Sequence, residues 1–150
     1  MLDLVFKNET PHGQWTADFF SPILAHTLDL LQISGQKVEV GLYVISPERS
    51  RELNREHRGK DRPTDVLSFP INDTTLKKYD ILPLGDVFIC ADVARRQAAE
   101  LNIPLRQEMA RLAVHGLLHL AGHDHERSPE DERTMIDLQE RILSELSISP

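Results

Sequence analysis

One segment of the chain, residues 105–121, constrains the fold more than any other. Apolar side chains such as Met109, Leu117 and Leu120 surround almost its whole helical circumference. One seam of polar side chains runs along it, formed by Glu108, Arg111, His115 and His119. A helix that is apolar nearly all round buries most of its surface. We therefore expect a central helix with a single polar seam, surrounded by other elements.

The segments around this helix predict a small sheet of about four strands. Alternating or apolar runs predict strands at residues 2–6, 37–45, 65–71 and 85–91, with a polar loop at 72–83. Helical spacing and cap signals predict helices at 15–31, 47–56, 92–101, 105–121 and 129–146. Pro22 either kinks the first helix or restarts it after a Ser21 cap. Pro70 places the strand at 65–71 on an edge, because proline cannot donate a ladder hydrogen bond. The pattern is typical of the α+β class, in one domain over residues 1–150.

Composition favours a cytoplasmic globular protein. Hydrophobic residues make up 40% of the chain, and no apolar run approaches the roughly 20 residues that span a bilayer. Nothing near the first residue is typical of a signal peptide. The single cysteine, Cys90, lies in the apolar run VFICA, so we expect a buried thiol, no internal disulfide and no membrane partner.

Charge is unevenly distributed along the chain. The formal net charge of −7 disfavours indiscriminate binding to nucleic acid. Between residues 49 and 62, however, five arginines and one lysine occur close together. Two interpretations remain open for this segment: a local patch that holds a phosphate chain, or a solvated helix face with i,i+4 ion pairs.

Histidines in the segment HGLLHLAGHDH, residues 115–125, have the spacing of metal ligands. His115 and His119 lie one helical turn apart, and Gly122 can turn the chain back so that a later histidine completes a triad. His123 and His125 both follow that glycine. The spacing is similar to that of the metzincin zinc proteases, which favours His125 as third ligand, yet Gly116 stands where those enzymes have their glutamate base. Three imidazoles with an open fourth position suit zinc, one ion per chain. The alternative is that these are ordinary polar residues of a half-buried helix.

Three blocks of the sequence resemble the YbeY family, bacterial zinc-dependent endoribonucleases of ribosomal RNA maturation. HGLLHLAGHDH is similar to the family signature at each fixed position, including Gly116. The block ELNREHRGKDRPTDVLSFP, residues 52–70, and the block LGDVFICADVARRQA, residues 84–98, also resemble family motifs. His57 departs from the tyrosine of many members, and Cys90 replaces a frequent serine. The resemblance is strong over residues 37–126.

The resemblance implies a site and a function. The family's metal ligands fall on His115, His119 and His125, and its important arginine falls on Arg58. It implies a zincin-like mixed sheet whose antiparallel edge strand borders the metal site, and residues 65–71 are our candidate for that strand. It also implies cleavage of single-stranded RNA in ribosomal RNA processing, including 3′-end maturation of 16S rRNA, and in ribosome quality control. The expected partners are ribosomal RNA, the small ribosomal subunit and ribosome-assembly proteins.

A zinc site without a carboxylate base favours phosphodiester chemistry over peptide chemistry. Water bound to zinc has a pKa near 7, whereas peptide cleavage also needs a proton delivered to a poor leaving group. Charge neutralisation at phosphate needs only the metal and a guanidinium such as that of Arg58. The alternatives are a zinc-dependent peptidase or amidohydrolase, for which Glu108 is the nearest acid along the helix, and a zinc-stabilised, non-catalytic ribosome-assembly factor.

Overall fold

The structure is a computed structural model that describes residues 1–33, 36–122 and 128–150. Its elements follow the predicted order β-α-β-α-β-β-α-α-α, with one short 3-10 helix, η1, added before the last strand. The strands are β1 (Leu2–Asn8), β2 (Lys37–Ile45), β3 (Val66–Pro70) and β4 (Ile81–Cys90). The helices are α1 (Ala17–Leu30), α2 (Pro47–Arg58), η1 (Lys77–Tyr79), α3 (Ala91–Leu101), α4 (Leu105–Leu120) and α5 (Pro129–Glu145).

The four strands form one mixed sheet in the order β1-β2-β4-β3. β1, β2 and β4 are mutually parallel, and β3 pairs antiparallel with β4 from Val66↔Ile89 to Pro70↔Gly85. The predicted edge position of β3 is therefore confirmed. Pro70 is the last residue of this edge strand. No strand of the described residues lies on its outer side, so its missing N–H costs no ladder hydrogen bond.

The predicted start of β4 at Gly85 is wrong, because the strand begins at Ile81. The predicted loop at 72–83 included residues 81–83, but these pair with residues 37–39 of β2, and a β-bulge follows Pro83. Glu39 pairs with Pro83 and Val40 with Gly85, which leaves Leu84 as the extra residue. Gly85 has φ +136°, and a Cβ there would overlap the carbonyl oxygen of Phe69 on the neighbouring strand.

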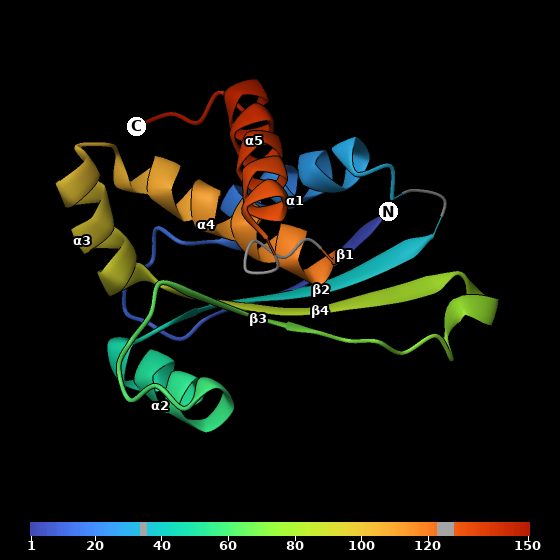
Figure 1. Ribbon diagram of the computed structural model, residues 1–150, viewed down its shortest axis with the longest axis horizontal. Coiled ribbons are helices and arrows are strands. Elements are labelled where there is room, and N and C mark those ends of the chain that lie inside the picture. The colour runs from blue at the N-terminus through green and yellow to red at the C-terminus, as the bar shows by residue number, and fades with distance from the viewer. Residues whose placement is uncertain (34–35, 123–127) are drawn as a thin grey trace.

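The helices lie unequally on the two faces of the sheet. Figure 1 shows α1, α3, α4 and α5 above the sheet and α2 below it. The main core lies between the sheet and the upper helices. A second cluster, formed by Ile45, Leu53 and Leu67, lies between the sheet and α2. Ten of the 16 residues of α4 are buried, so the expected central helix is confirmed. No helix in the described parts of the chain has the length and apolarity needed to cross a membrane.

Local signals set the ends of the helices that reach the site. The Ser46 hydroxyl accepts from the Arg49 N–H at 3.2 Å to begin α2, and Gly59, with φ +69°, ends it directly after Arg58. Thr16, not Ser21, caps α1, and that helix continues through Pro22, because this proline removes only one hydrogen bond of a well-buried helix.

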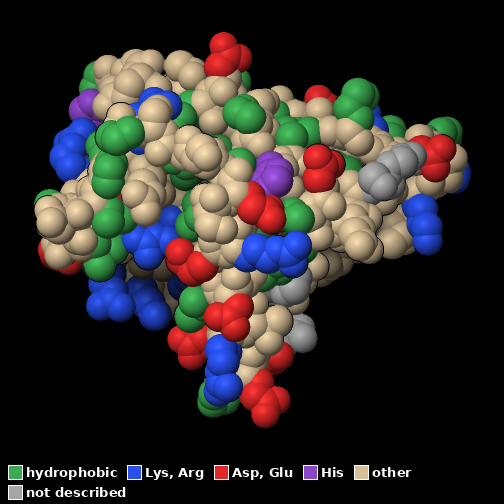
Figure 2. Space-filling view, turned by 90° about the horizontal axis from the view of Figure 1, so that it is seen from above, with side chains coloured by type: hydrophobic (Ala, Val, Ile, Leu, Met, Phe, Trp, Pro, Cys, Tyr) green, Lys and Arg blue, Asp and Glu red, His purple; other side chains and the backbone are tan. Residues whose placement is uncertain are grey.

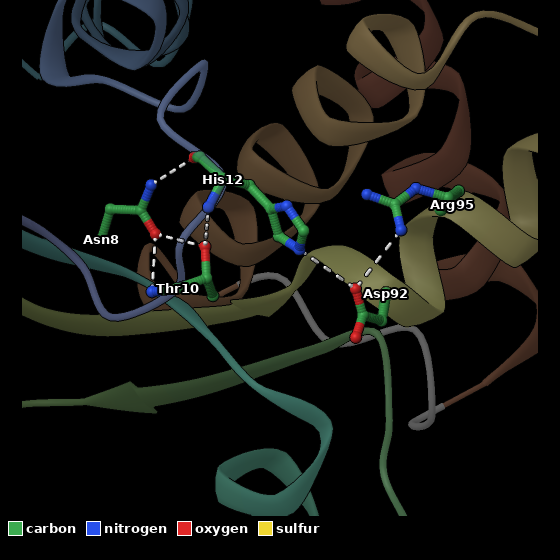
Figure 3. A network of polar contacts seen from close by, with 5 residues as sticks. All are labelled: Asn8, Thr10, His12, Asp92 and Arg95. Atoms are coloured by element: carbon green, nitrogen blue, oxygen red, sulfur yellow. Dashed lines mark hydrogen bonds and ion pairs between the residues drawn. The ribbon is translucent and has the colours of Figure 1, made fainter.

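A polar network ties the segment after β1 to the first turn of α3. Asn8 donates from its amide to the carbonyl of His12 at 2.7 Å, and its own side-chain oxygen accepts from Thr10. His12 Nε2 lies 3.7 Å from Asp92, which also contacts Arg95 at 3.6 Å. Figure 3 shows the five side chains bridging these two segments. The contact between His12 and Asp92 thus links the segment after β1 to the start of α3, a helix that packs beside α4.

Candidate active site

The two histidines of α4 converge as their spacing predicted. Their Nε2 atoms lie 3.1 Å apart, and their ring centroids are separated by 4.7 Å. Two nitrogens that each bind a tetrahedral zinc at about 2.0–2.1 Å lie about 3.3 Å from one another. The observed separation therefore matches two corners of such a site. Both rings are partly accessible, so an ion can reach them.

The predicted third ligand is not placed by the structure. Gly122 has φ +98°, the left-handed conformation expected of the residue that ends this helix. The following residues, 123–127, lie outside the described residues, and both His123 and His125 are among them. Within the described residues alone, no cluster of three histidine, cysteine, aspartate or glutamate side chains is suited to hold a metal ion.

A glutamine from α5 fixes the tautomer of His115. Gln139 Oε1 lies 2.9 Å from His115 Nδ1, and a carbonyl oxygen can only accept. Nδ1 therefore carries the proton, and Nε2 presents its lone pair toward His119. Sequence reasoning missed Gln139; it is the one polar member of the buried residues Met135, Gln139 and Ile142 of α5, and only the structure shows that burial.

Arg58 lies in the same hollow as the two histidines. This hollow, called the Arg58 hollow below, has a volume of about 340 Å³ and is lined by Arg58, Thr64, Asp65, Val66, Ser68, His115 and His119. Arg58 comes from the last turn of α2, the next four from β3 and the residues before it, and the histidines from α4. The fold thus brings a guanidinium and two imidazoles together from segments that are far apart in sequence.

Gly116 sets the spacing between the two walls of this hollow. A Cβ at position 116 would lie 2.6 Å from Val87 Cγ1 and 3.3 Å from Ser68 Oγ. The Ser68 hydroxyl also donates to the carbonyl of Gly116 at 3.2 Å. Only a glycine lets α4 approach β3 and β4 so closely. The residue at the position of the protease base is therefore required for packing.

Asp65 is a second residue that sequence reasoning missed. It lines the Arg58 hollow, and its Oδ1 accepts from the Val66 N–H at 2.7 Å and from the Thr64 hydroxyl at 3.2 Å. Its position within the block PTDVLSFP was the available signal. Asp65 lies 50 residues before His115 in the chain, and among the described residues it is the one carboxylate that lines the hollow.

Glu108 does not line the Arg58 hollow but forms a buried ion pair further along the seam. Its Oε1 accepts from Arg111 at 2.6 and 2.9 Å, and the residue is only 3% exposed. Burial raises the pKa of Glu108, and the neighbouring Arg111 opposes that rise. Its ion pair with Arg111 and its position outside the Arg58 hollow argue against Glu108 as a base for the histidine pair.

The two departures from the family pattern have structural explanations. The ring of His57 packs against Phe69, with centroids 4.7 Å apart. Cys90 is fully buried, and burial raises the pKa of its thiol. Sequence reasoning gave neither residue a chemical role; Cys90 is buried in the core, whereas His57 is exposed near the end of α2.

Comparison with known proteins identifies the family of the chain. Residues 6–147 match the family model described as Endoribonuclease YbeY. A Sulfurihydrogenibium protein named Endoribonuclease YbeY is 42% identical over 96% of this chain and 92% of its own length. A Persephonella marina protein of the same name is 41% identical over 97% of this chain and 94% of its own. The solution structure of a Thermotoga maritima protein superposes with a TM-score of 0.61 at 27% identity, covering 97% of this chain and 88% of that one. The chain therefore belongs to the endoribonuclease YbeY family.

Proposed function

We propose that this chain is a single-strand-specific, zinc-dependent endoribonuclease whose active site is the Arg58 hollow. One observation carries the proposal: the Nε2 atoms of His115 and His119 converge at 3.1 Å in a hollow that also contains Arg58. A paired metal-binding geometry beside a guanidinium is suited to a phosphodiester.

The proposed zinc ligands are His115, His119 and His125, with one ion per chain. The separation of the first two nitrogens and the orientation of His115 by Gln139 support this ligand set. When bound, zinc lowers the pKa of a coordinated water and neutralises phosphate charge. The architecture that this ligand set implies is zincin-like: α4 is the metal-binding helix, and the antiparallel edge strand β3 forms the opposite wall of the site.

Arg58 is proposed to hold the scissile phosphate. Its guanidinium presents a planar fork of donors that matches two phosphate oxygens. α2 ends at Arg58, so the side chain extends from the helix terminus into the hollow opposite the histidines. In this proposal, Arg58 binds the phosphate on one wall of the hollow, and Gln139 orients the imidazole of His115 on the other.

A peptidase or amidohydrolase is the principal rival, and the structure suggests which residue its base would be. Such an enzyme needs a carboxylate base at the hollow, and among the described residues Asp65 is the side chain that could serve. Two hydrogen bonds already hold Asp65 Oδ1 to its own segment, and Arg58 serves a phosphate better than a peptide. The second rival, a zinc-stabilised assembly factor without catalysis, would leave Arg58 without a chemical role.

In the cell, we propose that the chain acts as one domain over residues 1–150 in the cytoplasm. Its proposed tasks are ribosomal RNA processing, including 3′-end maturation of 16S rRNA, and ribosome quality control. The proposed partners are ribosomal RNA, the small ribosomal subunit and ribosome-assembly proteins. Family membership supports these assignments.

Cleavage of a labelled single-stranded RNA, before and after chelation, tests the proposal. We expect zinc-dependent internal cuts, and we expect His119→Ala to lose both bound zinc and cleavage. His26→Ala is the matched control, because His26 contacts Glu145 at 2.9 Å and lines neither wall of the hollow. Undiminished cleavage by metal-free His119→Ala would refute the proposed site, and cleavage of peptides but not of RNA would favour the rival.

A further inference from the structure

A second hollow adjoins the proposed active site. This hollow, called the α3 hollow below, has a volume of about 370 Å³ and lies between α3, α4, α5 and the start of β3. It shares Asp65 and His115 with the Arg58 hollow, so the two meet at the imidazole ring. Its volume falls within the range of about 300–1,000 Å³ that is typical of small-molecule sites.

The α3 hollow has a preorganised polar floor. Glu108 and Arg111 both line it, and the carboxylate of Glu108 holds the guanidinium through contacts of 2.6 and 2.9 Å. The side chain of Arg111 is 28% exposed, so part of it remains accessible from the hollow. Gln97 and Glu100 add an amide and a carboxylate from α3. Donors and acceptors are therefore present together, with the Glu108–Arg111 pair held in place and the α3 side chains at the edge of the hollow.

The charge of this lining excludes a phosphate as its natural occupant. Among the described residues that line it, the carboxylates of Asp65, Glu100 and Glu108 outnumber the one guanidinium, that of Arg111. Figure 2 shows several Lys and Arg side chains gathered at the left of the helical side of the molecule, and acidic side chains spread over its centre and lower end with some basic ones among them. A ligand for the α3 hollow must instead bring N–H donors for the carboxylates and an acceptor for Arg111. The apolar side chains of Leu101 and Leu112 provide contacts for a flat ring.

We propose that the α3 hollow binds a nucleobase bearing an exocyclic amine, in the nucleotide next to the scissile phosphate. This inference rests on the proposed function of the Arg58 hollow. A nucleotide carries its phosphate and its base on different sides of the ribose. Adjoining hollows, one with a guanidinium and one rich in carboxylates, therefore match the two ends of one nucleotide. Exocyclic amines donate to Glu100 and Gln97, whereas the corresponding carbonyl of uracil meets a carboxylate and is repelled.

The experiment compares oligouridine with the same strand carrying one internal cytidine. We expect the wild type to cut beside the cytidine with kcat/KM about tenfold above that at the matching uridine, the discrimination of one well-made contact to a base. Combining Gln97→Ala with Glu100→Gln should bring the two substrates close to equal rates. Glu52→Gln, on α2, is the matched control, because Glu52 pairs with Arg49 and does not line the α3 hollow.

Equal cutting of both strands by the wild type, or a preference retained by the double variant, would overturn the nucleobase site while leaving the ribonuclease intact. A wild type that cuts neither strand would instead contradict the proposed function. In that case, fluorescence anisotropy measures the affinity of the chelator-treated protein for each strand. Tighter binding of the cytidine strand would support the nucleobase site, and equal binding would refute it.

Discussion

Replacing Gly116 by alanine tests how the fold sets the geometry of the hollow. In the middle of a helix, alanine is favoured over glycine by about 1 kcal/mol. Here the new Cβ would lie 2.6 Å from Val87 Cγ1, and Val87 is fully buried in β4. Because a short β-branched side chain cannot swing aside, the overlap costs about 1–3 kcal/mol. We expect a net loss of about 1 kcal/mol in the free energy of unfolding, the difference of these two terms.

The same change should reduce cleavage by more than the loss of stability explains. Relief of the overlap moves α4 away from β3 and β4, which separates His115 and His119 from the wall that contains Ser68. A displacement of about 1 Å between reacting groups can lower a rate by about a hundredfold. Urea unfolding followed by circular dichroism gives the stability, and single-turnover cleavage of single-stranded RNA at saturating zinc gives the activity.

A double-mutant cycle isolates the contact. Adding Val87→Ala to Gly116→Ala should recover about 1 kcal/mol relative to the sum of the single changes. Gly13→Ala is the control, because no heavy atom lies within 4 Å of a Cβ built at position 13. If Gly116→Ala is more stable than the wild type and cleaves RNA at an undiminished rate, the close approach of α4 to Val87 does not set the site.

Three further predictions address the metal, the rival chemistry and the buried ion pair. Zinc content should be about one per chain in the wild type and in His123→Ala but lost in His125→Ala; the opposite pattern would reassign the third ligand. Gly116→Glu should lose ribonuclease activity without gaining zinc-dependent peptide cleavage, because the added side chain overlaps Val87; measurable proteolysis would indicate a protease scaffold. Burial raises the pKa of Glu108, so the folded chain binds this proton more tightly than the unfolded chain. The unfolding free energy of the wild type, relative to Glu108→Gln, should therefore fall as pH rises through that raised pKa, and a rise would show that Arg111 outweighs burial.

Elements with strong local signals were predictable from the sequence. The apolar circumference of residues 105–121 predicted a central helix, and α4 is that helix. Serine followed by proline predicted the starts of α2 and α5, where the hydroxyls of Ser46 and Ser128 do cap the helices. Pro70 predicted the edge strand, because its missing N–H is tolerated in few other places.

Features created by packing between distant segments were not predictable. Residues 81–83 belong to β4 and not to the predicted loop, because they pair with residues 37–39 of β2, a contact between distant segments that their own sequence does not indicate. Gln139 contacts a histidine 24 residues away, and helical periodicity within α5 does not say which side chain faces α4. Asp65 likewise reaches the hollow only because β3 lies against α4.

The most direct test of the central claim is to measure zinc content and RNA cleavage on the same preparation of Arg58→Ala. Removing one donor group that stabilises a developing charge lowers a rate by about 10²–10³-fold. We predict a loss of this size with zinc content unchanged, poor recovery in Arg58→Lys, and near-normal cleavage in Arg55→Ala, whose side chain pairs with Asp61 and lies outside the hollow. Cleavage of single-stranded RNA by zinc-loaded Arg58→Ala at the wild-type rate would contradict the account.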